Sequence, residues 1–282
     1  MSSAAVRAVN KNYYDPIISP LVKTSDLWLD FSDSSTITTT GGGLNKITAV
    51  TDKSISPKTV TVSGTGANYW DDSVLGYYTG AATASYITPA YSNSAGAGVE
   101  VIFIVFTLND LSNGNILLFG SSTTGARWIG VQASTATVFV SSYSNLAPIG
   151  GTALTTGKRY VLTVVQTTSN LYTYINGKLD ISTSNVSYSA FANGNLGTVG
   201  TAGTLRGVIH ELIAFGNTMT DSQRQNIEYY LINKWNVTNT ISSPLSVTGC
   251  TLWLDGNDAS TITYGTGTAV AQWNDKSGNG YN

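Results

Sequence analysis

The stretch KRYVLTVVQTTSNLYTYINGKLD, residues 158–180, gives the strongest local indication of the fold. Two runs rich in Val, Leu, Thr and Tyr flank Ser169-Asn170, and the second run ends in Asn176-Gly177. Asn-Gly supplies the positive φ angles that a type I′ turn requires. The stretch therefore predicts paired antiparallel strands with a tight hairpin turn at Asn176 and Gly177.

Upstream of this hairpin, the chain carries further strand-like segments. Residues 99–108, VEVIFIVFTL, form a nearly continuous run of β-branched and aromatic residues, which predicts a central strand covered on both faces. Residues 115–120, 126–132 and 137–142 alternate apolar with polar positions and predict an antiparallel meander. From Asp26 onward, turn residues separate such runs at a spacing of about 8 to 12 residues, which is typical of a sandwich or barrel.

One helix is predicted downstream, after the strand-like run GVIHELIAF. Thr220 is placed to cap this helix, and Gln223 stands three residues later as the capping-box partner. Ile227, Leu231 and Trp235 fall four residues apart and form an apolar face. We therefore expect a single amphipathic helix that lies against the sandwich.

The chain also contains an internal repeat. The motifs SPL, LWLD and SSTIT occur in this order from Ser19 onward. They recur as SPL, LWLD and ASTIT from Ser243 onward, and the two tryptophans, Trp28 and Trp253, lie 225 residues apart. The second copy contains too little chain to bury a core by itself.

These patterns predict four segments. They are an irregular arm at residues 1–24, the main domain at 25–236, a linker at 237–246 and the start of a second, incomplete copy at 247–282.

Three passages carry a family resemblance: LWLDFSDSSTIT, GKRYVLTVVQTTSNLYTYINGKL and GVIHELIAFGNTMTDSQRQNIEYYLINKW. Together they resemble the concanavalin A-like, laminin G-like superfamily, of the kind found in phage structural proteins and bacterial surface adhesins. The second copy is similar to the opening of such domains. The resemblance implies an all-β fold, a two-sheet antiparallel jelly-roll sandwich with one C-terminal amphipathic helix.

Composition excludes several classes of partner. The chain has 14 basic and 16 acidic residues, so it lacks the basic surface that nucleic acid requires. Cys250 is the only cysteine, which excludes an intramolecular disulfide. No apolar run approaches the roughly 20 residues of a membrane helix, and residues 1–16 contain no apolar signal segment. We expect no nucleic-acid partner and no membrane insertion, and a location on a virion or on an extracellular surface.

Enzymatic residues are not found in a recognisable pattern. A glycan hydrolase on this fold needs paired carboxylates, whereas Glu100, Glu211 and Glu228 lie on separate elements. His210 is the only histidine, and its apolar strand favours a core or rim position over a catalytic one. The sequence therefore predicts a protein that is not an enzyme.

Calcium is the one cofactor that the resemblance implies, because laminin G-like modules often hold it at a rim through Asp and Asn. The candidate ligands are Asp30, Asp33 and Asp110. For Asp30 and Asp33, capping of a turn by side-chain oxygens is the favoured alternative. We expect no cofactor, with calcium as the possibility to be tested.

Aromatic residues beside carboxylates are the candidates for glycan binding, because sugar rings stack on aromatic faces while polar groups satisfy their hydroxyls. For each candidate, a role in the core or in a subunit contact is the alternative. The candidates are Trp70, Asp71, Asp72, Tyr77, Tyr78, Trp128 and Tyr143.

Three functions remain open from the sequence. The first is a virion or surface structural protein, such as a fibre, tail or capsid-decorating subunit, which self-associates or binds other subunits through the arm and the second copy. The second is a carbohydrate-binding adhesin whose partner is a cell-surface glycan. The third, a glycan hydrolase, has no support at the level of residues.

Overall fold

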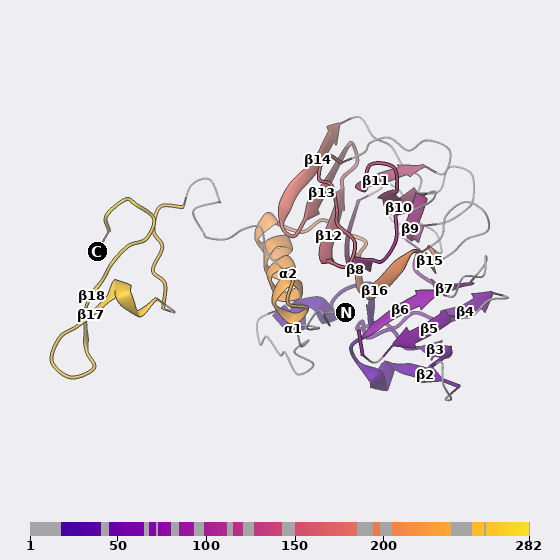
Figure 1. Cartoon of the computed structure of the whole chain (residues 1–282), viewed down its shortest axis with the longest axis horizontal. Coiled ribbons are helices and arrows are strands. Elements are labelled where there is room, and N and C mark those ends of the chain that lie inside the picture. The colour runs from indigo at the N-terminus through magenta and orange to yellow at the C-terminus, as the bar shows by residue number, and fades with distance from the viewer. Residues whose placement is uncertain are drawn as a thin grey trace, which may run out of the picture. The chain divides into compact units, whose positions relative to one another are not determined.

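The computed structural model describes residues 18–40, 45–64, 68–71, 73–79, 85–92, 99–111, 115–120, 127–142, 150–184, 194–197, 205–237, 250–256 and 258–281. The chain divides into two compact units, Met1–Thr238 and Asn239–Asn282, which we call the main unit and the second unit. The main unit runs from indigo to orange in Figure 1, and the second unit is yellow. No helix in the described ranges is long and apolar enough to span a membrane.

The larger sheet of the main unit has eight strands. Seven follow the order β14-β13-β12-β8-β16-β6-β5, and β1 pairs with β16 beside them. Their bounds are Leu27–Asp30 (β1), Asn68–Asp71 (β5), Gly76–Thr79 (β6), Glu100–Leu108 (β8), Arg159–Gln166 (β12), Asn170–Ile175 (β13), Lys178–Ser184 (β14) and Gly207–Phe215 (β16).

Smaller antiparallel sheets complete the sandwich (Figure 1). They are β11-β10-β9 at Thr137–Ser142, Arg127–Gln132 and Asn115–Gly120, β15-β7-β4 at Leu196–Gly197, Ser85–Pro89 and Val60–Gly64, and β2-β3 at Ile37–Thr39 and Ile47–Val50. A bridge between Gly120 and Asn195 joins the first two of these sheets. The expected all-β, antiparallel sandwich is confirmed.

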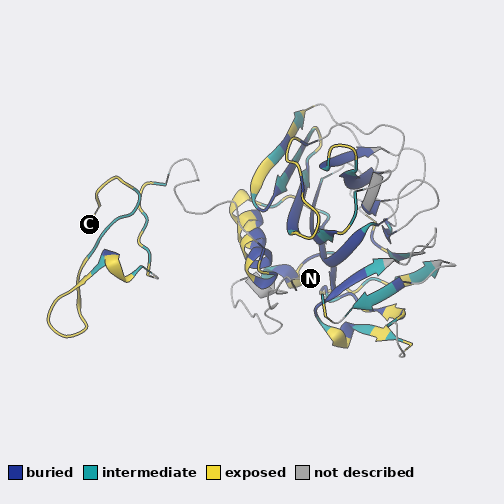
Figure 2. Cartoon of the chain, viewed as in Figure 1, coloured by how far each residue is buried: buried dark blue, intermediate teal, exposed yellow. Residues whose placement is uncertain are grey.

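Strand β8 is central, as expected from its apolar run. It lies between β12 and β16. Ile102 and Ile104 point into the core between the sheets, whereas Phe103 and Val105 lie in a second apolar cluster on the opposite face. Both faces of the strand are therefore covered, which explains why its sequence does not alternate (Figure 2).

The second cluster is covered by α2, Asp221–Lys234. Thr220 caps this helix, and its side chain and that of Gln223 form the expected capping box. Ile227 and Leu231 are fully buried, and so is Trp235, the residue that ends the helix. Figure 2 shows the helix with one buried and one exposed side, which confirms the amphipathic helix.

The predicted hairpin turn is also present. Asn176 and Gly177 have φ angles of 51° and 81°, and they connect β13 to β14. The Asn176 side chain accepts a hydrogen bond from the Val161 amide at 2.8 Å, which attaches the turn to β12.

The end of the expected N-terminal arm differs from an irregular chain. Ile18–Lys23 forms the short helix α1, and Val22 is fully buried in the cluster beneath α2. The apolar side chains of Leu21 and Val22 pack against this cluster. The contact joins segments that lie far apart in the sequence, so the local pattern around the prolines does not predict it.

The second unit contains the 3-10 turn η3, Ala259–Thr261, and the strand pair β17, Ile262–Tyr264, and β18, Val270–Trp273. Thr261 is the one buried residue among those that the structure describes in this unit. Figure 2 accordingly shows the second unit in the exposed and intermediate colours.

Candidate functional site

The β5–β6 hairpin carries several of the aromatic residues expected to bind a ligand, but it divides them between its two faces. Trp70 lies opposite Tyr77, and successive residues of a strand point to opposite sides. Tyr77 is fully buried, and its hydroxyl donates to Asn68 Oδ1 at 2.8 Å. The Trp70 indole donates to the Phe31 carbonyl at 2.9 Å. Both rings therefore belong to the packing of the sandwich.

The opposite face of the hairpin presents a stacked pair of tyrosines. Tyr69 lies opposite Tyr78, and their rings stack with centroids 5.3 Å apart and an interplanar angle of 30°. Both side chains are partly exposed. The apolar ring surface and the two hydroxyls are thus offered together at the surface.

Charged groups flank this pair on two sides. Asp71 lies two residues from Tyr69 on the same face, and its carboxylate accepts hydrogen bonds from the Ser73 amide and hydroxyl at 2.8 and 2.6 Å. Exposed Lys46 lies directly opposite Tyr69 across an isolated bridge. Partial burial, Asp71 and Tyr69 raise the pKa of Tyr78, so its phenol stays protonated further into the alkaline range than an ordinary tyrosine.

We call Lys46, Tyr69, Asp71 and Tyr78 the tyrosine platform. Aromatic rings beside a carboxylate, an ammonium group and phenolic hydroxyls suit a ligand that has apolar C–H faces and many hydroxyls. Sequence reasoning found Asp71 and Tyr78 but missed Tyr69 and Lys46. The alternation along residues 68–71 could have identified Tyr69, since it must face away from Trp70.

The remaining ligand candidates do not join the platform. Trp128 is only 4% exposed and packs on Phe139 with ring centroids 6.1 Å apart, so it is a core residue of the β9–β10–β11 sheet. Asp72 and Tyr143 lie outside the described residues.

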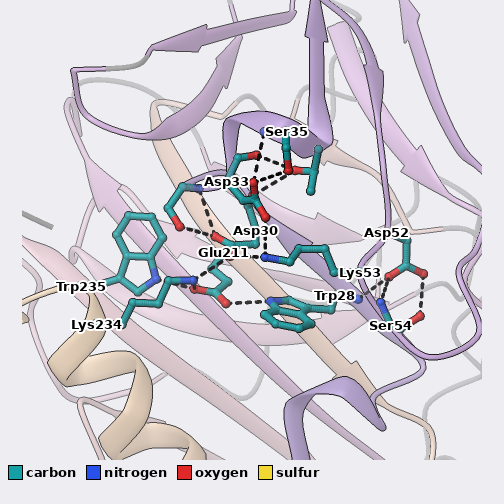
Figure 3. A network of polar contacts seen from close by, with 12 residues as sticks. Trp28, Asp30, Asp33, Ser35, Asp52, Lys53, Ser54, Glu211, Lys234 and Trp235 are labelled. Carbon is teal, nitrogen blue, oxygen red and sulfur yellow. Dashed lines mark hydrogen bonds and ion pairs between the residues drawn. The ribbon is translucent and has the colours of Figure 1, made fainter. Parts of the chain in front are cut away.

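The calcium candidates are engaged by basic side chains. Asp30 contacts Lys53 at 3.0 Å and Lys234 at 2.9 Å, and Asp33 contacts the same Lys53 at 2.8 Å (Figure 3). The Asp33 carboxylate also caps the 3-10 turn η1, Ser34–Thr36.

Asp110 lies elsewhere and pairs with Arg206 at 2.8 Å. Across the described ranges, no group of three or more His, Cys, Asp or Glu is placed to hold a metal. Three carboxylates that already face ammonium or guanidinium groups are poorly suited to calcium, because each cation competes for the same oxygens.

Asp30 instead belongs to a buried polar network that joins β1, β16 and α2 (Figure 3). Glu211 lies at its centre and accepts hydrogen bonds from the indoles of Trp28 and Trp235 at 2.8 and 2.5 Å. Lys234 contacts Glu211 at 2.8 Å and bridges it to Asp30. The network connects the first strand of the sandwich to its last strand and helix.

Burial acts against both carboxylates of this network, with different results. It raises the pKa of Glu211, which Lys234 opposes only in part. It also disfavours ionised Asp30, but Lys234 and Lys53 outweigh this effect and lower the pKa of Asp30 to about 2. The network is not accessible to a substrate, since Asp30 is 4% and Glu211 0% exposed.

Every glutamate of the chain is buried beside a cation. Besides Glu211 with Lys234, Glu100 pairs with Arg127 and Glu228 pairs with Arg224. His210 is also buried, with its ring 5.0 Å from that of Trp235. Burial and nearby Arg159 lower the pKa of His210 to about 3.

Comparison with known proteins shows the fold alone. Neither a protein-family model nor a curated protein matches the chain. Domain 4 of AbnA, an extracellular GH43 arabinanase from Geobacillus stearothermophilus solved in complex with arabinotriose, aligns with a TM-score of 0.50 and 18% identity, covering 73% of this chain and 98% of that one.

The binding domain of botulinum neurotoxin serotype D/C VPI 5993 aligns with a TM-score of 0.52 and 12% identity, covering 75% of this chain and 53% of that one. At these sequence identities, the comparison shows a shared architecture and nothing further. The main unit thus shares a β-sandwich fold with these structures.

Proposed function

We propose that the main unit is a carbohydrate-binding module without enzymatic activity, and that the tyrosine platform is its contact surface. The stacked, partly exposed Tyr69–Tyr78 pair carries this proposal. Aromatic rings that pack in a core need no charged groups beside them at the surface. A sugar-binding surface uses aromatic rings for stacking and flanking polar or charged groups for the sugar hydroxyls. Membership in the concanavalin A-like, laminin G-like superfamily, among its phage and adhesin members, is part of the same proposal.

The comparison with the arabinanase domain supports this function. That domain was solved with a bound oligosaccharide, arabinotriose. We propose by analogy that the present sandwich also binds an oligosaccharide, on its own platform and with its own selectivity. The buried, cation-paired glutamates support a binding role over hydrolysis, since hydrolysis requires carboxylates that reach the glycosidic bond.

A glycan array with the labelled full chain tests the proposal, with calcium in one set of wells and a chelator in the other. For any glycan that binds, Tyr69→Ala and Tyr78→Ala should each weaken the affinity about 3- to 10-fold, the effect of losing one aromatic contact. Tyr229→Ala is the matched control, because Tyr229 is 61% exposed on α2, away from the platform.

Two results would contradict carbohydrate binding at this site. One is an array without any bound glycan in either set of wells. The other is a glycan whose affinity is unchanged by both platform substitutions.

A structural subunit of a virion or of a cell-surface array is the second candidate function, and it is compatible with the first. The exposed apolar side chains of the second unit favour it, since such surfaces mark contacts with other proteins. Light scattering of the full chain tests self-association, and a monodisperse monomer at high concentration would count against this function.

A further inference from the structure

Lys234 is the one buried lysine among the residues that the structure describes. It is 3% exposed, whereas every other described lysine is exposed or partly exposed. Its ammonium group lies 2.8 Å from Glu211 Oε2 and 2.9 Å from Asp30 Oδ2, and both carboxylates are buried. Figure 3 shows the three side chains converging on one another. A primary amine and two carboxyl groups are thus held together away from bulk solvent.

The other two glutamates of the chain are also buried, but their partners are arginines. Glu100 pairs with Arg127, and Glu228 pairs with Arg224. A guanidinium group does not lose its proton in proteins and is therefore not a nucleophile, whereas a lysine amine becomes one once it is deprotonated. Of the three glutamates, Glu211 is therefore the one that faces a potential nucleophile.

The two carboxyl groups beside Lys234 differ in how readily they ionise. Burial raises the pKa of Glu211, and Lys234 offsets this only in part. Burial also acts against ionised Asp30, but Lys234 and Lys53 outweigh it and lower the pKa of Asp30 to about 2. Glu211 is thus the group that more readily takes up a proton and becomes an electrophilic carboxylic acid. Asp30 stays a carboxylate that can accept a proton.

Two indole groups polarise the Glu211 carboxyl. Trp28 donates to Oε1 at 2.8 Å, and Trp235 donates to Oε2 at 2.5 Å. Fixed N–H donors of this kind stabilise the negative charge that develops on a carbonyl oxygen when a nucleophile attacks its carbon. Both tryptophans are buried, so packing orients the two donors before any reaction begins.

We propose that Lys234 and Glu211 condense to form an intramolecular amide bond, with Asp30 as the proton acceptor. Asp30 takes a proton from the Lys234 ammonium, and the free amine attacks Glu211 Cδ to form the new C–N bond. The C–Oε2 bond then breaks, and Oε2 leaves as water with the carboxyl proton and one proton from Nζ. Asp30 finally releases the proton that it took. The reaction needs no oxidant, reductant or cofactor, and it links β16 to the end of α2.

The condensation follows folding and is slow. The amine and the carboxyl lie 23 positions apart in the chain and meet only when α2 packs on β16. Burial acts to lower the pKa of Lys234, but Glu211 and Asp30 outweigh it and raise this pKa, so the free amine is a minor species. Contact within the folded domain compensates, because groups held together react as if at very high concentration.

The second unit supplies a control within the same chain, because it repeats the motif around Trp28. The amide of Trp28 donates to Asp52 at 2.8 Å, and that of Trp253 donates to Asp275 at 2.9 Å. In both copies the next-but-one serine also donates to this aspartate.

The lysine of the motif also contacts carboxylates in both copies, but it is not buried. Lys53 contacts two aspartates at 3.0 and 2.8 Å, and Lys276 contacts Asp255 and Asp258 at 2.9 and 2.8 Å. The side chains of Lys53 and Lys276 are 24% and 27% exposed. Hydrogen bonds from Lys276 and Ser260 lower the pKa of Asp258 to about 2, so it stays ionised. We therefore expect no amide bond at either lysine, although the distances are equally short.

Mass spectrometry of the full chain tests the proposal. The protein is incubated in its folded state at neutral and at mildly alkaline pH, and is then denatured for measurement. We expect an intact mass that is lower by one water molecule than the sequence requires. Tandem mass spectrometry of a tryptic digest should show a branched peptide in which Lys234 is joined to Glu211, while Lys276 is unmodified.

Three variants, each checked for folding by circular dichroism, identify the groups involved. Lys234→Arg keeps the charge beside both carboxylates but removes the amine, and should retain the full sequence mass. Asp30→Asn keeps the size of the side chain but removes the proton acceptor, and should slow the loss of water about 100-fold or more. Lys276→Arg is the matched control and should lose water as the unaltered chain does.

The unaltered chain decides the matter even if a variant does not fold. A folded chain that keeps the full sequence mass after prolonged incubation overturns the proposal. A branched peptide that joins Lys234 to Asp30 overturns the assignment of Glu211 as the electrophile. Loss of water that persists unchanged in folded Lys234→Arg also overturns the proposal, because it then arises at another site.

Discussion

The motif around Trp28 and its copy around Trp253 share their hydrogen bonds but not their surroundings. In the exposed copy, hydrogen bonds from Lys276 and Ser260 lower the pKa of Asp258 to about 2. In the main unit its counterpart, Asp33, has a lowered pKa for the same reason, because hydrogen bonds from Lys53 and Ser35 outweigh its partial burial. Asp30, the counterpart of Asp255, is instead deeply buried, and Lys234 from a distant helix acts with Lys53 to outweigh this burial and keep its pKa low. The comparison shows that a short sequence determines the local geometry, whereas distant segments determine its burial and energetics.

The largest expected effect comes from removing the distant partner. Lys234→Ala leaves Asp30 and Glu211 buried with less compensating charge, and it should lower the free energy of unfolding by about 3 to 5 kcal/mol. Urea denaturation followed by circular dichroism measures this loss. Lys178→Ala, at an exposed lysine, is the control and should change the value by less than about 0.5 kcal/mol.

Acid should weaken the main unit before it affects the second unit. The pKa of buried His210 is about 3, below the value of about 6.5 expected in the unfolded chain. Between these values the unfolded chain binds a proton that the folded chain does not, so stability present above pH 6.5 is lost as the pH falls toward 3.

The expected loss between pH 7 and pH 4.5 is roughly 2 to 3 kcal/mol. Because His210 is the only histidine of the chain, His210→Gln should flatten the profile in this range. Urea denaturation at a series of pH values provides the measurement, and equal slopes for both proteins would contradict the assignment.

Matched tryptophan substitutions compare the two copies directly. Trp28→Phe keeps a buried ring but removes the indole donor to Glu211, and should lower the free energy of unfolding by about 1 to 2 kcal/mol. Trp253→Phe should leave the main unfolding transition unchanged, since Trp253 is partly exposed in the other unit. If both substitutions lowered the free energy of unfolding equally, the two tryptophans would be equally buried in solution, which would contradict this prediction.

The smallest effect is expected from the lysines of the motif. Lys53→Ala should lower the free energy of unfolding by about 1 kcal/mol, because the side chain is partly exposed to solvent. Lys276→Ala should leave the main transition unchanged and should only speed amide hydrogen exchange at residues 276 and 277. Exchange measured by mass spectrometry distinguishes this local effect from a global one.

Much of the fold could be predicted from the sequence because its signals are local. The Asn176-Gly177 turn, the Thr220 capping box and the apolar run of β8 each depend on neighbouring residues, and each was confirmed. The repeat was equally visible, since LWLD and the Asp-Lys-Ser triplet recur.

The site was less predictable because it depends on which face of a strand is covered. Trp70 and Tyr78 both follow the rules for a sugar contact, yet the sheet turns one inward and the other outward. Asp30 resembles an exposed turn residue in the sequence, and its partner Lys234 lies about two hundred residues away. Pairing over such distances is not encoded in any short pattern.

The bond between Trp28 and Glu211 joins residues that lie 183 positions apart in the chain. On a ribosome that adds about 5 to 20 residues per second, the LWLD strand is made roughly 10 to 40 seconds before its partner strand. During this interval its leucines remain uncovered, and the order of synthesis makes them a target for chaperones or for a neighbouring nascent chain. The sandwich therefore cannot close at β1 until β16 has been synthesised.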